Sequence, residues 1–198
     1  MWPFRVVASV APQECWPTIM AEAADGKVFT AGRDHSGRPI LWLRSKNERT
    51  FDNDGWKCGN LINLVYNMER AIHQLPAGGD GKWLLIIDFN GYSMLNAPPM
   101  STSKHTIKIL QDHYPERLHC AILVAAPGLF RFAWAALSPF IDKVTKEKVE
   151  WCVGAPLVQR ELLQRYAPLD QLEVAIGGDK TTVFDPARYL EADPWRGR

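Results

Sequence analysis

One helix-sized stretch of the chain, residues 129–137, is almost entirely hydrophobic, and charged clusters flank it at 114–118 and 142–148. The stretch is too short to cross a bilayer, which takes about 20 apolar residues. Because such a helix is apolar on nearly every face, we expect it to be buried or to lie against a hydrophobic partner. An apolar segment beside fixed charges favours a binding site for an amphiphile, in which the hydrophobic part covers acyl chains and the charges contact a head group.

Strand-like and helix-like patterns alternate along the rest of the chain. Residues 27–33 and 39–44 are short strand patterns joined by Asp-His-Ser-Gly at 34–37, a typical turn sequence, and they predict a hairpin. Apolar residues recur at spacings of four and three over 60–75, which predicts the clearest helix. Further strands are predicted at 83–89, 120–125, 149–153 and 173–176, and further helices at 18–24, 101–113 and 157–166. This order predicts an α/β fold with a largely parallel sheet, followed by a polar tail that packs loosely.

Composition fits one soluble domain and points away from nucleic acid. The chain has 198 residues, of which 46% are hydrophobic and 23% charged, enough for a substantial core. A formal net charge of +1 gives no large positive field, and the lysines after residue 142 do not alternate with aromatic residues. Eight Trp residues suit a ligand pocket or a membrane interface, although the core is the commoner place for any one of them.

The cysteines and the N-terminus indicate a reduced, cytoplasmic protein. Cys15, Cys58, Cys120 and Cys152 lie far apart and form no Cys-x-x-Cys pair, so a zinc or redox site is not expected. Cys120 and Cys152 lie in strand patterns and should be buried. The sequence shows no signal peptide and no membrane-spanning stretch, which favours a cytoplasmic location.

Two motifs resemble those of enzymes but lack residues that the chemistry requires. Gly-Gly-Asp-Gly-Lys at 78–82 precedes a strand instead of following one, and Trp83 stands where a phosphate loop needs Ser or Thr. Ser93 resembles half of a nucleophile elbow, but Leu95 replaces the second Gly. The last histidine is His119, which would crowd a catalytic triad into one helix and its exit. The histidines also show no metal-binding spacing, so we expect no enzyme activity, no metal and no cofactor.

A series of short motifs follows in a distinctive order along the chain. The motifs lie at 26–29, 32–40, 87–91, 114–118, 126–130, 139–142 and 172–178. In this order and spacing the chain resembles the CRAL-TRIO lipid-binding domain, the domain of the yeast phosphatidylinositol transfer protein and its relatives. The resemblance predicts an N-terminal arm at 1–25, the lipid-binding domain at 26–178 and a C-terminal tail at 179–198.

The resemblance implies a mixed sheet flanked by helices, with a lipid held between the sheet and a mobile gate helix at residues 130–141. In phosphoinositide-binding members, the Glu of a Pro-Glu-Arg motif and a Thr and a Lys after the gate engage the inositol phosphate. These positions are Glu116, Thr145 and Lys148 here. Lys and a hydroxyl can bind phosphate oxygens and a carboxylate can accept from inositol hydroxyls, although Glu116 and Lys148 could also be ordinary surface charges. The residues expected in the pocket and gate are Trp83, Leu85, Phe130, Phe132, Trp134, Leu137 and Phe140.

The chain departs from the family pattern in two places. Members usually carry a three-helix segment before this domain, and the chain starts too late to contain it. We therefore expect a minimal form, a fragment, or a different use of residues 1–24. Members that also carry phosphatidylcholine place Ser and Thr at alternate positions of one strand. Trp83 and Leu85 occupy those positions here, so a choline site of that type is not expected.

The expected function is to bind, and to transfer or present, a membrane lipid, foremost phosphatidylinositol. The expected partners are this phospholipid or another hydrophobic ligand and, transiently, a membrane surface, which would make the protein peripheral to membranes. A protein partner stays open, and nucleic acid is not expected. Two alternatives remain: the same fold with a sterol, tocopherol or retinoid ligand, and a scaffold or membrane-recruitment module whose pocket has collapsed.

Overall fold

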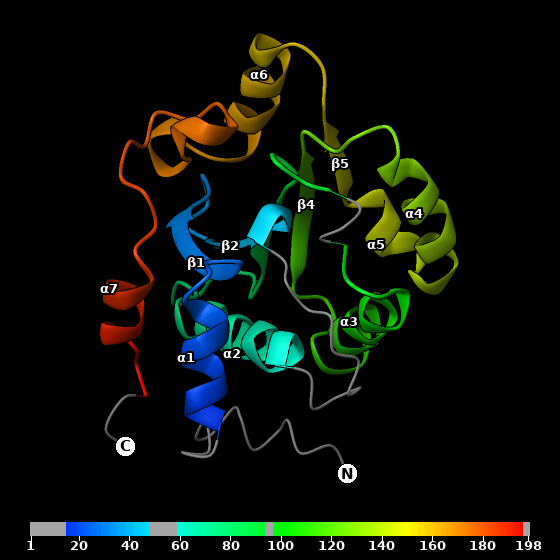
Figure 1. The fold of residues 1–198 in the computed structure, drawn as a ribbon. Coiled ribbons are helices and arrows are strands. Elements are labelled where there is room, and N and C mark those ends of the chain that lie inside the picture. The colour runs from blue at the N-terminus through cyan, green and yellow to red at the C-terminus, as the bar shows by residue number, and fades with distance from the viewer. Residues whose placement is uncertain (1–14, 48–58, 94–96, 196–198) are drawn as a thin grey trace.

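A mixed five-stranded sheet forms the centre of the protein (Figure 1). The computed structural model describes residues 15–47, 59–93 and 97–195. The strands lie in the order β1-β2-β3-β4-β5; β1 and β2 are antiparallel and the later pairs are parallel. The strands are β1 (Val28–Arg33), β2 (Pro39–Arg44), β3 (Trp83–Asp88), β4 (Leu118–Val124) and β5 (Val149–Cys152). The predicted α/β fold with a largely parallel sheet is confirmed.

Helices cover both faces of this sheet. The α-helices are α1 (Trp16–Ala23), α2 (Gly59–His73), α3 (Met100–His113), α4 (Phe130–Leu137), α5 (Lys143–Glu147), α6 (Pro156–Tyr166) and α7 (Pro186–Glu191). Short 3-10 turns are η3 (Ser45–Asn47), η6 (Ser138–Phe140), η7 (Leu169–Gln171) and η8 (Val174–Ile176). Figure 1 shows α6 and α7 on the other side of the sheet from α3, α4 and α5. Within the described residues, no helix combines the length and the apolar character that crossing a membrane requires.

Alternate residues of each strand enter two separate cores, as the two-residue period of a strand requires. On one face, α2 packs Val65 and Met68 into a cluster with Leu41, Trp83 and Leu85. The opposite face forms a second cluster with α6 and with the chain that follows it, through residues such as Ile40, Trp42, Leu84, Ile86 and Leu163. Cys120 and Cys152 are buried in this second cluster, as predicted.

The first hairpin is fixed by side chains of its own turn. The Asp34 carboxylate accepts hydrogen bonds from the backbone N–H groups of Ser36 and Arg38, both at 2.8 Å. Arg38 also donates to Asp80 through Nε and Nη2, at 2.8–3.1 Å, which ties the hairpin to the loop before β3. These bonds from Arg38 lower the pKa of Asp80 to about 2.

The predicted strand at 173–176 is wrong. The segment forms η8, and only Glu173 makes an isolated bridge, to Lys180. The chain reverses at Gly177, which has a φ of 99°, and the backbone N–H of Gly178 donates to the Glu173 carbonyl at 3.0 Å. Because the turn satisfies these backbone groups locally, the segment forms no ladder with a strand of the described residues.

The prediction of a loosely packed tail is also wrong. Phe184 stacks on Phe29 with ring centroids 3.8 Å apart. The Tyr189 hydroxyl accepts from the backbone N–H of Thr30 at 3.0 Å and donates to Asn67 at 2.6 Å. These aromatic residues stand singly in a polar sequence and create no periodic pattern, so their packing could not be predicted from local hydrophobicity.

Candidate functional site

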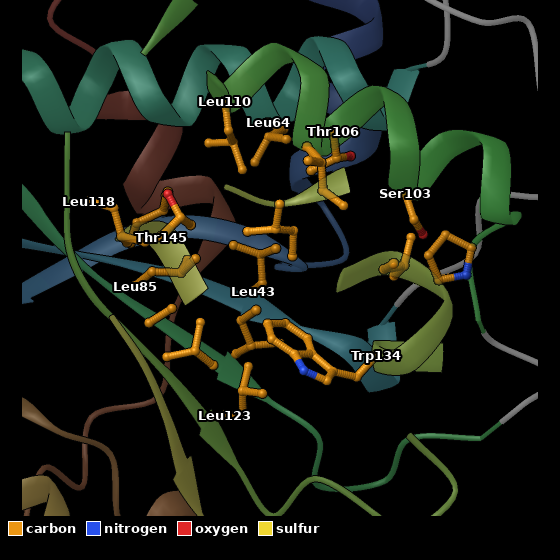
Figure 2. Close-up of a pocket in the computed structure, with 18 of the residues that line it drawn as sticks. Leu43, Leu64, Leu85, Ser103, Thr106, Leu110, Leu118, Leu123, Trp134 and Thr145 are labelled. Carbon is orange, nitrogen blue, oxygen red and sulfur yellow. The ribbon is translucent and has the colours of Figure 1, made fainter. Parts of the chain in front are cut away.

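A cavity of about 680 Å³ lies between one face of the sheet and the helices α3, α4 and α5 (Figure 2). Its floor is built by side chains that lie side by side on parallel strands, among them Leu43, Leu85, Ala121 and Leu123. Leu64 and Leu110 close the opposite side from α2 and α3 (Figure 2). The size and the apolar lining are typical of a site for a hydrophobic small molecule.

One end of this cavity carries the charged residues that the sequence singled out. Glu116, Thr145 and Lys148 all line it. The Lys148 Nζ lies 3.5 Å from the Glu116 Oε2 and forms an ion pair across the end of the cavity. The side chain of Lys148 is 21% exposed and that of Glu116 is 77% exposed. The structure therefore brings all three predicted head-group residues to one place.

The backbone holds these charges in position. The carbonyl of Lys148 accepts a hydrogen bond from the N–H of Ala121 at 2.8 Å, which fixes the end of α5 to β4. Glu116 has a φ of 57°, a left-handed conformation that is uncommon for a residue other than Gly. Such a conformation is kept only where the surrounding turn imposes it, and backbone strain of this kind clusters at functional sites.

Asp142, the N-cap of α5, also lines the cavity, although the sequence pattern placed it only in a charged cluster and not among the ligands. Its carboxylate accepts from the backbone N–H of Thr145 at 2.8 Å. Hydrogen bonds from the Thr145 hydroxyl and N–H lower the pKa of Asp142 to about 2, so it is ionised at neutral pH. An Asp directly before the first residue of a helix is a typical N-cap, which could have pointed to α5.

The predicted pocket residues divide between the inside and the outside of the cavity. Those that line it are Trp83, Leu85, Phe130, Trp134 and Leu137. Figure 2 shows the Trp134 indole reaching from α4 into the cavity beside Leu123. Phe132 and Phe140 lie outside the lining, 75% and 48% exposed. The hydrophobic helix is therefore not buried on every face, and no residue of α4 is fully buried.

Aromatic side chains of α4 contact rings on the rest of the domain. The ring of Phe130 lies 4.4 Å from that of Phe89, and Trp134 meets Trp151 edge-on at 5.9 Å. The guanidinium of Arg131 lies 5.4 Å from the Trp151 ring centroid. Since both inner rings line the cavity, any movement of α4 changes the shape of the cavity.

A second group of polar residues in the cavity was also missed. Ser103 and Thr106 project from α3 into the cavity at the end away from Thr145 (Figure 2), and Thr102 is also part of the lining. Thr102 and Thr106 are four positions apart and Ser103 and Thr106 are three apart, so each of these pairs shares a face of the helix. The sequence does not mark them as ligand-binding residues, because Ser and Thr near the start of a helix are common as caps.

Comparison with known proteins agrees with this architecture. The family model described as CRAL/TRIO domain matches residues 23–178. A CRAL-TRIO domain-containing protein of Schizosaccharomyces pombe is 34% identical over 171 residues, which are 86% of this chain and 16% of that protein. The phosphatidylinositol transfer protein PDR17 of Saccharomyces cerevisiae is 33% identical over 138 residues, 66% of this chain and 37% of that protein.

A solved structure supports the fold independently. The crystal structure of Sfh5 matches with a TM-score of 0.54 at 18% identity, over 65% of this chain and 48% of that one. The chain spans less than half of the length of each of these three proteins. Because the family model covers most of the chain, and the sheet, helices and cavity agree with it, the chain belongs to the CRAL-TRIO domain family.

Proposed function

We propose that the protein binds phosphatidylinositol, with the inositol phosphate at Glu116, Thr145 and Lys148 and the acyl chains along the apolar floor of the cavity. The observation that carries the proposal is the ion pair of Lys148 and Glu116 at one end of a cavity whose floor is apolar. Lipid binding is the property of the family, and one relative is named as a phosphatidylinositol transfer protein.

The charges at this end match the chemistry of an inositol phosphate. The ammonium of Lys148 can donate to phosphate oxygens, and a charged hydrogen bond of this kind is stronger than a neutral one. Glu116 and Asp142 supply carboxylates, which accept hydrogen bonds from a ring of hydroxyl groups. A head group that combines one anionic phosphate with many hydroxyls uses both kinds of partner, whereas a simple anion would be repelled by the two carboxylates.

The apolar cavity need not supply all the energy of removing the acyl chains from water. Each buried methylene contributes about 0.8 kcal/mol, so two typical chains together exceed about 20 kcal/mol. The membrane already supplies this energy. A cavity lined by Leu, Ile, Phe and Trp side chains needs only to be as favourable for the acyl chains as the bilayer interior. The free energy of moving the lipid from the bilayer to the cavity is then close to zero, and the head group decides specificity.

We assign the opening of this cavity to a movement of residues 130–141, which comprise α4 and η6. Gly128, just before α4, has no neighbouring atom within 4 Å of the position that a side chain would occupy. The outward residues Phe132 and Phe140 are exposed and suit insertion into the interface of a bilayer. Arg131 and Lys143 beside them suit anionic lipid. In this mechanism, α4 moves out of the cavity when its outer face makes a transient, peripheral contact with a membrane.

The size of the cavity argues against the scaffold alternative. A recruitment module with a collapsed pocket would have its side chains packed together beneath α4. About 680 Å³ of open space lies there instead. Protein interiors are otherwise close-packed, so a space of this size is not a chance defect of packing.

The head-group assignment is tested by removing both charges. Protein carrying Lys148→Ala and Glu116→Ala is incubated with vesicles of phosphatidylcholine and phosphatidylinositol, re-isolated, and its bound lipid quantified by mass spectrometry. We expect phosphatidylinositol pickup to fall to background, because the head group loses its charged partners while the fold keeps its core.

The matched control is Lys108→Ala. Lys108 is exposed on α3, pairs with Asp112 at 2.7 Å and does not line the cavity. This variant should pick up lipid as the wild type does. Unchanged pickup by the double variant would reject Glu116 and Lys148 as head-group ligands.

A further inference from the structure

The segment that follows the family-matched part of the chain docks on the domain without joining the sheet. The family model ends at residue 178, and residues 184–193, here called the clasp, lie beyond it. The sheet of the described residues contains no strand from the clasp. Figure 1 shows α7, the helix of the clasp, beside α1. A segment that docks mainly through side chains, without a strand ladder, contacts the domain as a bound peptide would.

Two aromatic residues of the clasp lie together against the edge strand β1. The rings of Phe184 and Tyr189 pack edge-on with centroids 5.1 Å apart, and Phe184 stacks on Phe29 at 3.8 Å. The Tyr189 hydroxyl accepts from the backbone N–H of Thr30 at 3.0 Å and lies 3.0 Å from the Thr30 Oγ1. Because β1 is the last strand of the sheet, Tyr189 supplies the partner that a further strand would otherwise supply.

The same tyrosine also connects β1 to α2. Its hydroxyl donates to the Oδ1 of Asn67 at 2.6 Å, and the guanidinium of Arg70 lies 3.7 Å from its ring centroid. Both Asn67 and Arg70 are buried. Polar side chains that are buried without partners are costly, so the surface of α2 beneath the clasp is suited to a tyrosine and not to an aliphatic residue.

A carboxylate of the clasp balances the buried cation. Arg70 donates through Nη2 to the carbonyl of Ala192 at 3.1 Å and through Nη1 to the hydroxyl of Tyr66 at 3.0 Å. The Tyr66 hydroxyl in turn donates to Asp193 at 2.9 Å. Removing one partner from such a buried pair leaves an uncompensated charge, so the domain carries a positive site and the clasp carries the matching negative group.

The clasp forms part of its structure through its own sequence. The carboxylate of Asp185 caps α7 and accepts from the backbone N–H groups of Ala187 at 2.9 Å and Arg188 at 3.3 Å. Pro186 begins the helix, a position that proline favours. A ligand whose bound conformation is favoured by local interactions loses less entropy when it binds.

We propose that the surface of β1 and α2 at Phe29, Thr30, Tyr66, Asn67 and Arg70 is a peptide-binding site, which the clasp of the same chain occupies. The site selects an aromatic residue, a tyrosine five positions later and a carboxylate four positions after the tyrosine. It accepts a separate copy of the clasp peptide when the covalently attached clasp is released. None of these five residues lines the lipid cavity, so the inference does not depend on phosphatidylinositol binding.

The test releases the attached clasp and supplies a separate one. Full-length protein carrying Phe184→Ala and Tyr189→Ala keeps the site but loses two anchors of its own clasp. A fluorescein-labelled peptide of residues 179–195 is titrated with this variant and with the wild type, and binding is followed by fluorescence anisotropy. We expect saturable binding to the variant. Binding to the wild type should be at least about tenfold weaker, because its own clasp competes for the site.

Two altered peptides test which side chains are recognised. Tyr189→Phe in the peptide removes the hydroxyl that bonds Thr30 and Asn67, and should weaken binding to the double variant about tenfold. Val183→Ala is the matched control, because Val183 is 74% exposed, and this peptide should bind as the unchanged one does.

Three results would overturn the site: a folded double variant that does not bind the peptide, a wild type that binds it as tightly as the variant does, or a Tyr189→Phe peptide that binds as well as the unchanged one. If circular dichroism shows that the double variant is unfolded, full-length Tyr189→Phe replaces it and should bind the unchanged peptide more tightly than the wild type does. If this variant is unfolded as well, the clasp belongs to the folding core and is not a ligand, and the proposal is wrong.

Discussion

Adjacent residues of β4 face opposite sides of the sheet and allow the cavity to be tested against the packed core. Ala121 pairs with Leu85 and Val149 on the neighbouring strands and lines the cavity. Cys120 belongs to the second core cluster, against α6, and is 4% exposed. The same substitution, to phenylalanine, should therefore have opposite effects at the two positions.

The magnitudes follow from the space available. At Cys120, a phenyl ring has to displace close-packed neighbours, and overpacking of this kind costs about 1–3 kcal/mol. At Ala121, the ring can enter the cavity, where burying a Phe side chain is worth up to about 1.5–3 kcal/mol. We expect Ala121→Phe to keep or raise the free energy of unfolding, and Cys120→Phe to lower it.

The assay combines urea unfolding with phosphatidylinositol pickup from vesicles. Ala121→Phe should unfold at the urea concentration of the wild type or higher and lose most of its lipid pickup, because the ring occupies the floor on which acyl chains lie. Cys120→Phe should unfold earlier and, while folded, still bind lipid. If Ala121→Phe is destabilised as much as Cys120→Phe, the interior is packed where the structure places a cavity. If it is stable and binds lipid normally, acyl chains do not use this floor.

Two further predictions concern the outer face of α4 and the first hairpin. Phe132→Glu should change the free energy of unfolding by less than about 0.5 kcal/mol, because the side chain is 75% exposed. The fraction of the protein that co-sediments with phosphatidylinositol-containing vesicles should fall about tenfold. If that fraction does not fall, this face of α4 is not the membrane contact. The pKa of Asp80 is lowered to about 2 by Arg38, so this carboxylate stabilises the fold above about pH 4 and the contribution is lost as the pH falls toward 2. Asp80→Asn should therefore lower the free energy of unfolding at pH 7, and this free energy should fall less steeply between pH 4 and 2 than it does in the wild type. Urea unfolding at each pH measures both effects, and parallel pH curves for wild type and variant would contradict the pairing.

The sheet and most helices could be predicted from the sequence because their signals are local. The hairpin follows from the turn at 34–37, and the Asp34 side chain indeed bonds the turn backbone. The helix at 60–75 follows from its apolar spacing, and Val65 and Met68 are fully buried. Each of these elements carries its own pattern, so the order of elements and the fold class could be predicted.

Features that depend on distant contacts could not be predicted. Phe184 and Tyr189 are single aromatic residues in a polar tail, and their places on β1 depend on the completed sheet. The segment 173–176 has a strand-like composition, but its backbone is satisfied by the turn at Gly177. A run of three apolar residues, 174–176, carries too little information to distinguish these outcomes.

The candidate site was predicted in part. The family resemblance gave Glu116, Thr145 and Lys148 as head-group residues, and the structure places the charged atoms of Glu116 and Lys148 3.5 Å apart. The sequence could not say that Phe132 faces outward while Trp134 faces inward, because the helix is apolar on both sides. Nor could it give the hydroxyls of α3, since only the tertiary structure leaves Thr102 buried without a partner among the described residues.

Native mass spectrometry, after equilibration with vesicles that contain phosphatidylinositol, shows whether the cavity holds a molecule of this lipid. We expect a complex of one protein with one phosphatidylinositol in the wild type, and bare protein for Ala121→Phe. A wild-type spectrum that shows only the mass of the protein, under conditions in which the vesicles remain intact and the protein folded, would contradict it.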